Sequence, residues 1–176
     1  ITLSGIENPE FAVSSDSPPL IINAPNVTLD GLSITNTAYR PTELVRIIST
    51  SAKITNCNLT GRGKPTLNLL MDGITTVEEG AGNYVIEKNR ITAFGTGIRL
   101  LPYSEGAILD NNISDSINGI CIDRSIATIT GNSWSGSPND TDILITANTQ
   151  AGPPYDNTEV LSLQNNKAVV KDQRII

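Results

Sequence analysis

The most informative absence in this sequence is histidine, which does not occur once among its 176 residues. Without histidine the chain has no imidazole base for Ser-His-Asp or Cys-His nucleophile systems and no imidazole ligand for a metal ion. Cysteine is nearly as scarce, because the chain has only Cys57 and Cys121. Two cysteines make neither a disulfide framework nor a zinc site, and we expect no disulfide between them.

Aromatic residues and helix signals are also rare. Only 4% of the residues are aromatic. No stretch has the apolar spacing of an amphipathic helix, and no apolar run is long enough to span a membrane. What the chain has instead is abundant threonine, serine, asparagine and isoleucine. That composition is typical of short strands joined by tight turns.

The charge of the chain argues against two classes of partner. Its net charge is −6, with acidic and basic residues mixed and no lysine or arginine cluster. Nucleic acids and anionic membranes both require a basic surface, so we expect no nucleic-acid partner and no membrane insertion. The length suits one domain spanning residues 1–176. Because the chain begins at Ile1 without a visible signal peptide, we expect an excerpt of a longer protein.

A short frame repeats along the chain: an apolar anchor, an asparagine three positions later and another apolar residue five positions later. The asparagine position holds Asn89, Asn111, Asn132 and Asn166, and in two earlier copies it holds Leu32 and Cys57. The anchors are Leu29, Ile54, Ile86, Ile108, Ile129 and Leu163. Their intervals fall in the range of solenoid repeats, about 20 to 50 residues.

A second apolar pair follows each frame, with one residue between its members. The pairs are Val45/Ile47, Leu67/Leu69, Ile98/Leu100, Ile120/Ile122 and Ile143/Ile145. This spacing indicates a strand with one buried face, so each repeat contains three short strands and no room for a helix. We therefore predict an all-β fold, a single-stranded right-handed parallel β-helix of six or seven coils. Asparagines of successive coils would lie about 4.8 Å apart and hydrogen-bond as a ladder.

The asparagine positions and the phrases "VTLDGLSIT", "AKITNCNLT" and "ATITGNSWS" carry a resemblance to a known family. Over about residues 20–170 the chain resembles the right-handed parallel β-helices of the pectate-lyase-like superfamily. This resemblance implies a secreted or cell-surface protein whose partner is a polysaccharide or cell-surface glycan. It does not imply one activity, because the superfamily includes lyases, hydrolases, esterases, phage spikes and non-catalytic surface proteins.

Outward positions on the third strand of each repeat suggest a catalytic set. They form a column of Arg46, Asn68, Arg99, Cys121 and Leu144, and Asp123 stands one outward step beyond Cys121. The resembling lyases use a cationic residue as base or stabiliser and acidic residues that hold calcium. The resemblance thus implies Arg46 and Arg99 in the cationic role, Asp123 in the acidic role and calcium as cofactor. No catalytic motif of the superfamily matches, and a surface Arg–Asp pair without function is the alternative.

Long connections after the third strand suggest a binding notch. The segments 71–83 and 146–157 would project on either side of the short turn 101–106. Binding sites of solenoids usually lie on such loops. The predicted binding residues are Asp72, Glu78, Glu79, Tyr103, Glu105, Tyr155 and Asp156. An acidic notch with two tyrosines can hold a sugar or a cation, and insertions tolerated without any binding role are the alternative.

The second strand offers two outward polar columns. One holds Ser33, Asn58, Arg90, Asn112, Ser133 and Lys167, and the other holds Thr35, Thr60, Thr92, Ser114, Ser135 and Val169. Such a face can hydrogen-bond a polysaccharide. It also invites comparison with ice-binding solenoids, although Arg90 and Lys167 interrupt its regularity. Simple strand propensity of serine and threonine explains the same columns without any ligand.

Two functions therefore remain open at the level of sequence. The first is an extracellular carbohydrate-directed module that binds a polysaccharide, either with or without lyase-type cleavage. The second is a non-catalytic structural module of an adhesin, spike or filament. In the second case, open strand edges at the ends of the coil stack would favour homo-oligomers or end-to-end stacking.

Overall fold

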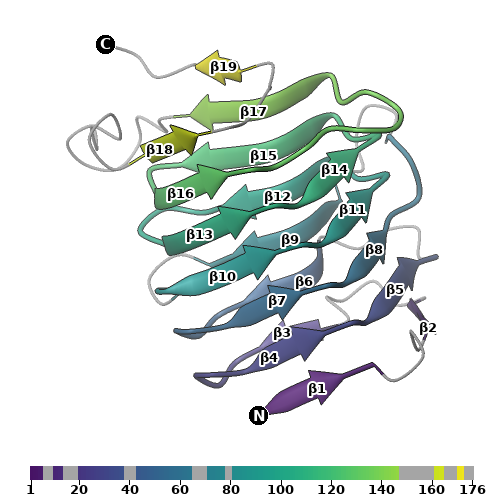
Figure 1. The fold of residues 1–176 in the computed structure, drawn as a ribbon, viewed down its shortest axis with the longest axis vertical. Coiled ribbons are helices and arrows are strands. Elements are labelled where there is room, and N and C mark those ends of the chain that lie inside the picture. The colour runs from purple at the N-terminus through teal and green to yellow at the C-terminus, as the bar shows by residue number, and fades with distance from the viewer. Residues whose placement is uncertain are drawn as a thin grey trace.

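The chain folds as a stack of short parallel strands that rises from the N-terminal to the C-terminal end (Figure 1). The computed structural model describes residues 1–5, 10–13, 20–37, 43–64, 71–77, 81–146, 161–164 and 170–172. Within these residues every regular element is a strand, and the strands form three parallel sheets, which we call A, B and C. The prediction of an all-β parallel β-helix is confirmed.

Each sheet collects equivalent strands from successive coils. Sheet A contains β1 (Thr2–Ser4), β4 (Thr28–Asp30), β7 (Lys53–Thr55), β10 (Tyr84–Glu87), β13 (Glu105–Leu109), β16 (Ile126–Thr130) and β18 (Leu161–Gln164). Sheet B contains β2 (Glu10–Val13), β5 (Ser33–Asn36), β8 (Asn58–Thr60), β11 (Arg90–Thr92) and β14 (Asn112–Ser114). Sheet C contains β3 (Leu20–Ile22), β6 (Glu43–Ile47), β9 (Asp72–Thr76), β12 (Thr96–Leu100), β15 (Asn118–Asp123), β17 (Thr141–Thr146) and β19 (Val170–Asp172).

A coil passes through sheets A, B and C in that order. Within the described part of the chain, five coils have a strand in all three sheets, and two further coils contribute β16 with β17 and β18 with β19. Ser133 also pairs with Asn112, which extends sheet B by one residue into the sixth coil. In Figure 1 the front strands run to the right and the rear strands to the left as the chain rises, so the winding is right-handed.

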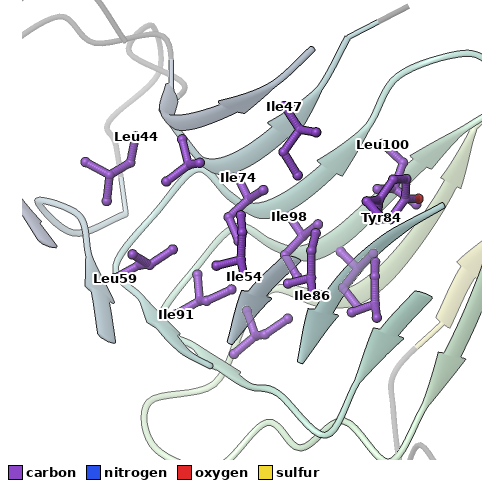
Figure 2. Packing of buried hydrophobic residues seen from close by; sticks show 14 of the residues in the cluster. Leu44, Ile47, Ile54, Leu59, Ile74, Tyr84, Ile86, Ile91, Ile98 and Leu100 are labelled. Atoms are coloured by element: carbon purple, nitrogen blue, oxygen red, sulfur yellow. The ribbon is translucent and has the colours of Figure 1, made fainter. Parts of the chain in front are cut away.

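The core consists of columns of apolar side chains from the three sheets. The predicted anchors Leu29, Ile54, Ile86, Ile108, Ile129 and Leu163 are successive partners in sheet A. Sheet B adds Ile34, Leu59, Ile91 and Ile113 in register. Figure 2 shows isoleucine and leucine side chains of these columns filling the space between the sheets. Each fully buried side chain of this size stabilises the fold by about 1.5–3 kcal/mol.

The predicted asparagine ladder is present and its hydrogen bonds run from coil to coil. The Nδ2 groups of Asn89 and Asn111 each donate to the Oδ1 of the next asparagine at 3.0 Å. The same oxygens, on Asn111 and Asn132, accept the backbone N–H of the preceding asparagine at 3.0 Å. Each Nδ2 also donates at 2.9 Å to an anchor carbonyl of the coil before. Asparagine is therefore tolerated beside the core because its amide is satisfied. Asn166 lies outside the described residues.

A sharp two-residue junction between sheets A and B orients the ladder. The residue before each ladder position has a positive φ: Gly31 (66°), Asn56 (55°), Lys88 (55°), Asp110 (54°) and Gly131 (70°). This left-handed conformation suits glycine, asparagine and aspartate best, and those residues fill four of the five positions. The chain turns there without inserted residues, so the next side chain points into the stack.

The third coil differs from the prediction. Its sheet C strand is β9, in which Ile74 pairs with Val45 on one side and Ile98 on the other. The predicted pair Leu67/Leu69 lies outside the described residues. The prediction that 71–83 is one projecting loop is wrong for Asp72–Thr76, because these five residues form strand β9, which pairs with β6 on one side and β12 on the other.

A column of buried glycines runs through three successive strands of sheet C, β9, β12 and β15. Gly73, Gly97 and Gly119 each precede an inward isoleucine. A Cβ on Gly73 would lie 2.5 Å from the carbonyl oxygen of Gly97, and one on Gly97 would lie 2.7 Å from that of Gly119. No larger residue fits where one coil lies so close to the next. The recurrent "DGI", "TGI" and "NGI" is therefore the signal that the apolar spacing missed.

Candidate functional site

The outer face of sheet C carries most of the predicted column of charged and sulfur-bearing side chains. In register, the outward residues of successive strands are Ile21, Arg46, Thr75, Arg99, Cys121 and Leu144. Thr75 occupies the position predicted for Asn68, because β9 is the strand that lies between β6 and β12 in sheet C. Arg46 and Arg99 therefore lie two coils apart, about 10 Å at the usual strand spacing.

Arg99 is the centre of a compact polar cluster. Its Nε and Nη2 donate to the two carboxylate oxygens of Asp72 at 2.6 and 3.2 Å. Nη2 also donates to Thr96 Oγ1 at 2.9 Å, and Nη1 lies 3.8 Å from the Cys121 sulfur. Thr75 Oγ1 donates to Asp72 at 3.3 Å. The guanidinium is thus fixed by a two-pronged ion pair, the strongest arrangement that arginine makes with a carboxylate.

The local backbone explains why these side chains meet. Asp72 and Thr75 flank Gly73 and Ile74, and Thr96 and Arg99 flank the equivalent pair in the next coil. Contacts between residues three apart recur in successive coils, including the ion pair of Arg46 with Glu43. The strand backbone at this position, which holds glycine in β9 and β12 and Leu44 in β6, therefore sends two outward side chains of one strand toward each other.

Burial and charge shift the pKa values of this cluster. Burial raises the pKa of Asp72 above its ordinary value, although the hydrogen bonds and charge of Arg99 oppose the shift. Burial tends to lower the pKa of Arg99, but hydrogen bonds and charge from Asp72 outweigh it and the net shift is upward. Burial likewise raises the pKa of the Cys121 thiol. Arg99 therefore stays protonated, which suits it to stabilise negative charge and not to abstract a proton.

The predicted catalytic residues are divided among separate ion pairs. Arg99 binds Asp72, Arg46 binds Glu43, and Asp123 Oδ1 lies 3.2 Å from Arg124 Nε. Asp123 acts on Arg99 through its charge, which helps to raise the pKa of Arg99. The prediction did not pair Arg99 with Asp72 because it placed Asp72 in a loop. The shared "DGI" and "TGI" phrases would have aligned the two strands.

Only part of the predicted notch falls in the described residues. Glu78, Glu79, Tyr155 and Asp156 lie outside them. Asp72 begins β9, whereas Tyr103 and Glu105 stand in the connection that follows β12 and at the start of β13. Asp72 is therefore at the opposite end of the sheet C strand from the corner that holds the other two. At that corner Tyr103 contacts Arg124, whose guanidinium lies 5.8 Å from the centre of the tyrosine ring.

The predicted polar columns on the outer face of sheet B are present from β5 to β14, and Ser133 continues the first of them through its bridge with Asn112. Ser33, Asn58, Arg90 and Asn112 are successive partners, and so are Thr35, Thr60, Thr92 and Ser114. Asn58 and Arg90 are exposed, Thr60 and Thr92 are half-buried, and Ser114 is buried. Lys167 and Val169 lie outside the described residues. This face presents hydroxyl and amide groups at one-coil intervals, with a single charged side chain, Arg90, among these eight residues.

The described residues contain no group of three or more His, Cys, Asp or Glu side chains that could hold a metal ion. Cys57 and Cys121 are both free and buried. In the part of the chain that the structure describes, no helix is long and apolar enough to cross a membrane.

Comparisons with protein-family models, with curated proteins and with solved structures give no match for this chain. The fold itself defines the class of protein, a parallel β-solenoid with an internal amide ladder.

Proposed function

We propose that this chain is an extracellular carbohydrate-binding module of the pectate-lyase-like type, secreted or held at a cell surface, whose ligand is a polysaccharide. The observation that carries the proposal is the pair of polar columns on the outer face of sheet B. Their hydroxyl and amide groups recur about every 4.8 Å along the stack. A polymer whose own hydroxyl groups repeat along its length can form the same hydrogen bonds at successive coils.

A panel of neutral and acidic polysaccharides tests this proposal by calorimetry or affinity electrophoresis. The double variant Thr60→Val, Thr92→Val removes two hydroxyls and keeps the side-chain shape. We expect it to weaken binding on the order of tenfold, since each lost hydrogen bond costs about 0.5–1.5 kcal/mol. The control is Thr128→Val, an exposed threonine of β16 in sheet A. Wild-type protein that binds no member of the panel would contradict the proposal.

Lyase-type cleavage is tested in the same panel, with and without calcium. In such a reaction Arg99 would stabilise the carboxylate of a uronate, because its pKa is raised and it remains charged. Unsaturated product that absorbs in the ultraviolet would support cleavage. Binding without product would leave a lectin-like module.

A structural module of an adhesin, spike or filament is the second candidate, and one observation favours it. The three arginines on and beside the outer face of sheet C already bind the carboxylates of Glu43, Asp72 and Asp123. A uronate would have to compete with these internal partners. Protein that neither binds nor cleaves any polysaccharide, and that assembles with rising concentration in analytical ultracentrifugation, would support this candidate.

A further inference from the structure

Tyr103 and Arg124 form a second polar and aromatic feature, at the corner between sheets C and A. We infer that Tyr103, supported by Arg124, is a stacking platform for one uncharged pyranose ring. This inference rests on the proposed function, because the ring would belong to the same polysaccharide. It adds a site that lies on a different corner from the sheet B columns and takes the sugar by its apolar face.

Tyr103 stands out by its exposure. Half of its surface is exposed, at 50%, whereas Tyr84 and Phe94 are fully buried and Trp134 packs against the core. The other large apolar side chains exposed among the described residues are aliphatic: Ile1, Leu3 and Ile21. An exposed aromatic ring can cover the C–H face of a sugar, and tyrosine makes such contacts with little loss of side-chain entropy.

The backbone conformation at Tyr103 indicates independently that the side chain has a role. Every described turn from sheet C to sheet A has a residue with positive φ. The first three are small and polar: Asn26, Ser51 and Asn83, with φ between 54° and 58°. The next two are Tyr103 (65°) and Arg124 (43°). Bulky residues are outliers in this conformation, and asparagine would fit with less strain. The chain thus keeps two large side chains where the backbone favours a small one.

The two side chains are held in a fixed arrangement. The Tyr103 N–H donates to the Arg124 carbonyl oxygen at 3.0 Å, which joins the two turns. The Arg124 guanidinium lies over the ring, is largely buried and pairs with Asp123. A cation over a tyrosine ring attracts it electrostatically. The platform is therefore ordered before any ligand arrives, which lowers the entropic cost of binding.

The charges around the ring favour an uncharged sugar. Asp123 is bound to the same guanidinium, and Glu105, two residues after Tyr103, is exposed at the start of β13. One positive and two negative side chains leave the corner acidic, so it would repel uronates. Carboxylates also accept hydrogen bonds from sugar hydroxyls. The ligand class that fits is a neutral pyranose residue of a polysaccharide.

Three variants of the full chain test the platform against neutral and uronate polysaccharides. Tyr103→Asn removes the ring and installs the residue that the turn prefers. We expect its dissociation constant for a neutral polysaccharide to rise at least about tenfold. Its melting temperature should stay within a few degrees of wild type or increase. Tyr103→Phe keeps the ring and should bind within about threefold of wild type. Arg124→Asn removes the support and should weaken binding less than Tyr103→Asn does.

The outcomes separate the platform from the proposed function. If wild type binds a neutral polysaccharide and Tyr103→Asn binds it equally, the platform is overturned while the proposed function stands. The same holds if Tyr103→Asn loses binding only to uronate polymers. If wild type binds nothing in the panel, both fail together. Loss of binding in Tyr103→Asn with an unchanged melting temperature, and retention in Tyr103→Phe, establishes the platform.

Discussion

Cys57 occupies a ladder position without an amide and shows what the amide contributes. Its N–H donates to Asn89 Oδ1 at 2.9 Å, so the ladder above it is complete. Its sulfur lies 3.8 Å from the Leu29 carbonyl, whereas asparagines in other coils approach the equivalent carbonyl at 2.9 Å. Burial raises the pKa of the Cys57 thiol, and a backbone hydrogen bond from Leu32 partly opposes this shift. The thiol therefore makes a longer and weaker contact with the anchor carbonyl than the amide nitrogen makes in other coils.

Replacing Cys57 by asparagine should extend the ladder by one coil. The new amide would donate to the Leu29 carbonyl and to Asn89 Oδ1, and would accept from the Leu32 N–H. We expect Cys57→Asn to increase the free energy of unfolding by about 1 kcal/mol, or the melting temperature by about 2–4 °C. Urea unfolding measures this gain. Cys57→Ala, which removes the sulfur and adds no amide, should be less stable than wild type. Equal stability of Cys57→Asn and Cys57→Ala would show that the added amide does not stabilise the ladder.

At the scale of the strand, the glycine column decides how closely sheet C stacks. A Cβ on Gly97 would lie 2.6 Å from Ile113 Cγ2 and 2.7 Å from the Gly119 carbonyl oxygen. The second contact is with backbone, which cannot move aside without disturbing the pairing of β12 with β15. The outward cluster of Asp72, Thr96 and Arg99 depends on the same close approach.

We therefore expect Gly97→Ala to lower the free energy of unfolding by at least about 2 kcal/mol, because it forces an overpacked backbone contact. Gly82→Ala is the matched control, since a Cβ there meets nothing closer than Thr50 Cγ2 at 3.7 Å. Gly82→Ala should be neutral or slightly stabilising. Chemical denaturation of both variants gives the comparison, and similar stabilities would show that the stack can relax around Gly97.

The strands that the sequence predicted best are those with fixed internal spacing. Anchor, asparagine and next apolar residue always span the same two-residue junction, so sheets A and B and the ladder could be placed in register. The connection from sheet B to sheet C varies in length, and apolar spacing alone then allowed Leu67/Leu69 to take the place of Ile74. That error moved Asp72 into a loop and hid its ion pair with Arg99. The contact of Tyr103 with Arg124 was not predictable, because the apolar pattern aligns strands of successive coils and does not align the residues of the turns between them.

At the scale of the molecule, backbone pairing joins each coil only to the coils before and after it. Stability of such an array approximates a sum of coil and interface contributions. The asparagine ladder adds a line of hydrogen bonds parallel to the stack, through Asn89, Asn111 and Asn132. Loss of its central member would separate the amides on either side and weaken the coupling between the two halves.

We expect Asn111→Ala to lower the free energy of unfolding by more than about 2 kcal/mol. It leaves the buried Asn89 N–H without its acceptor, which costs about 1–3 kcal/mol, and it removes the hydrogen bonds that the Asn111 Nδ2 group donates to the Ile86 carbonyl and to Asn132 Oδ1. The urea transition should also broaden, because the halves unfold less cooperatively. Asn58→Ala, an exposed position on β8, should change stability by no more than about 0.5 kcal/mol. A sharp, unshifted transition for Asn111→Ala would count against the ladder as a coupling element.

The two-residue junction between sheets A and B sets the register of one coil relative to the next. From the second to the sixth coil this junction keeps its two-residue length, so a copied coil would enter that part of the stack already in phase, with its amide above one neighbour and below the other. The molecule can therefore grow or shrink by whole coils, in increments of about 4.8 Å, without redesign of its interior. The length of the stack can therefore change without any change in the side chains on its outer faces.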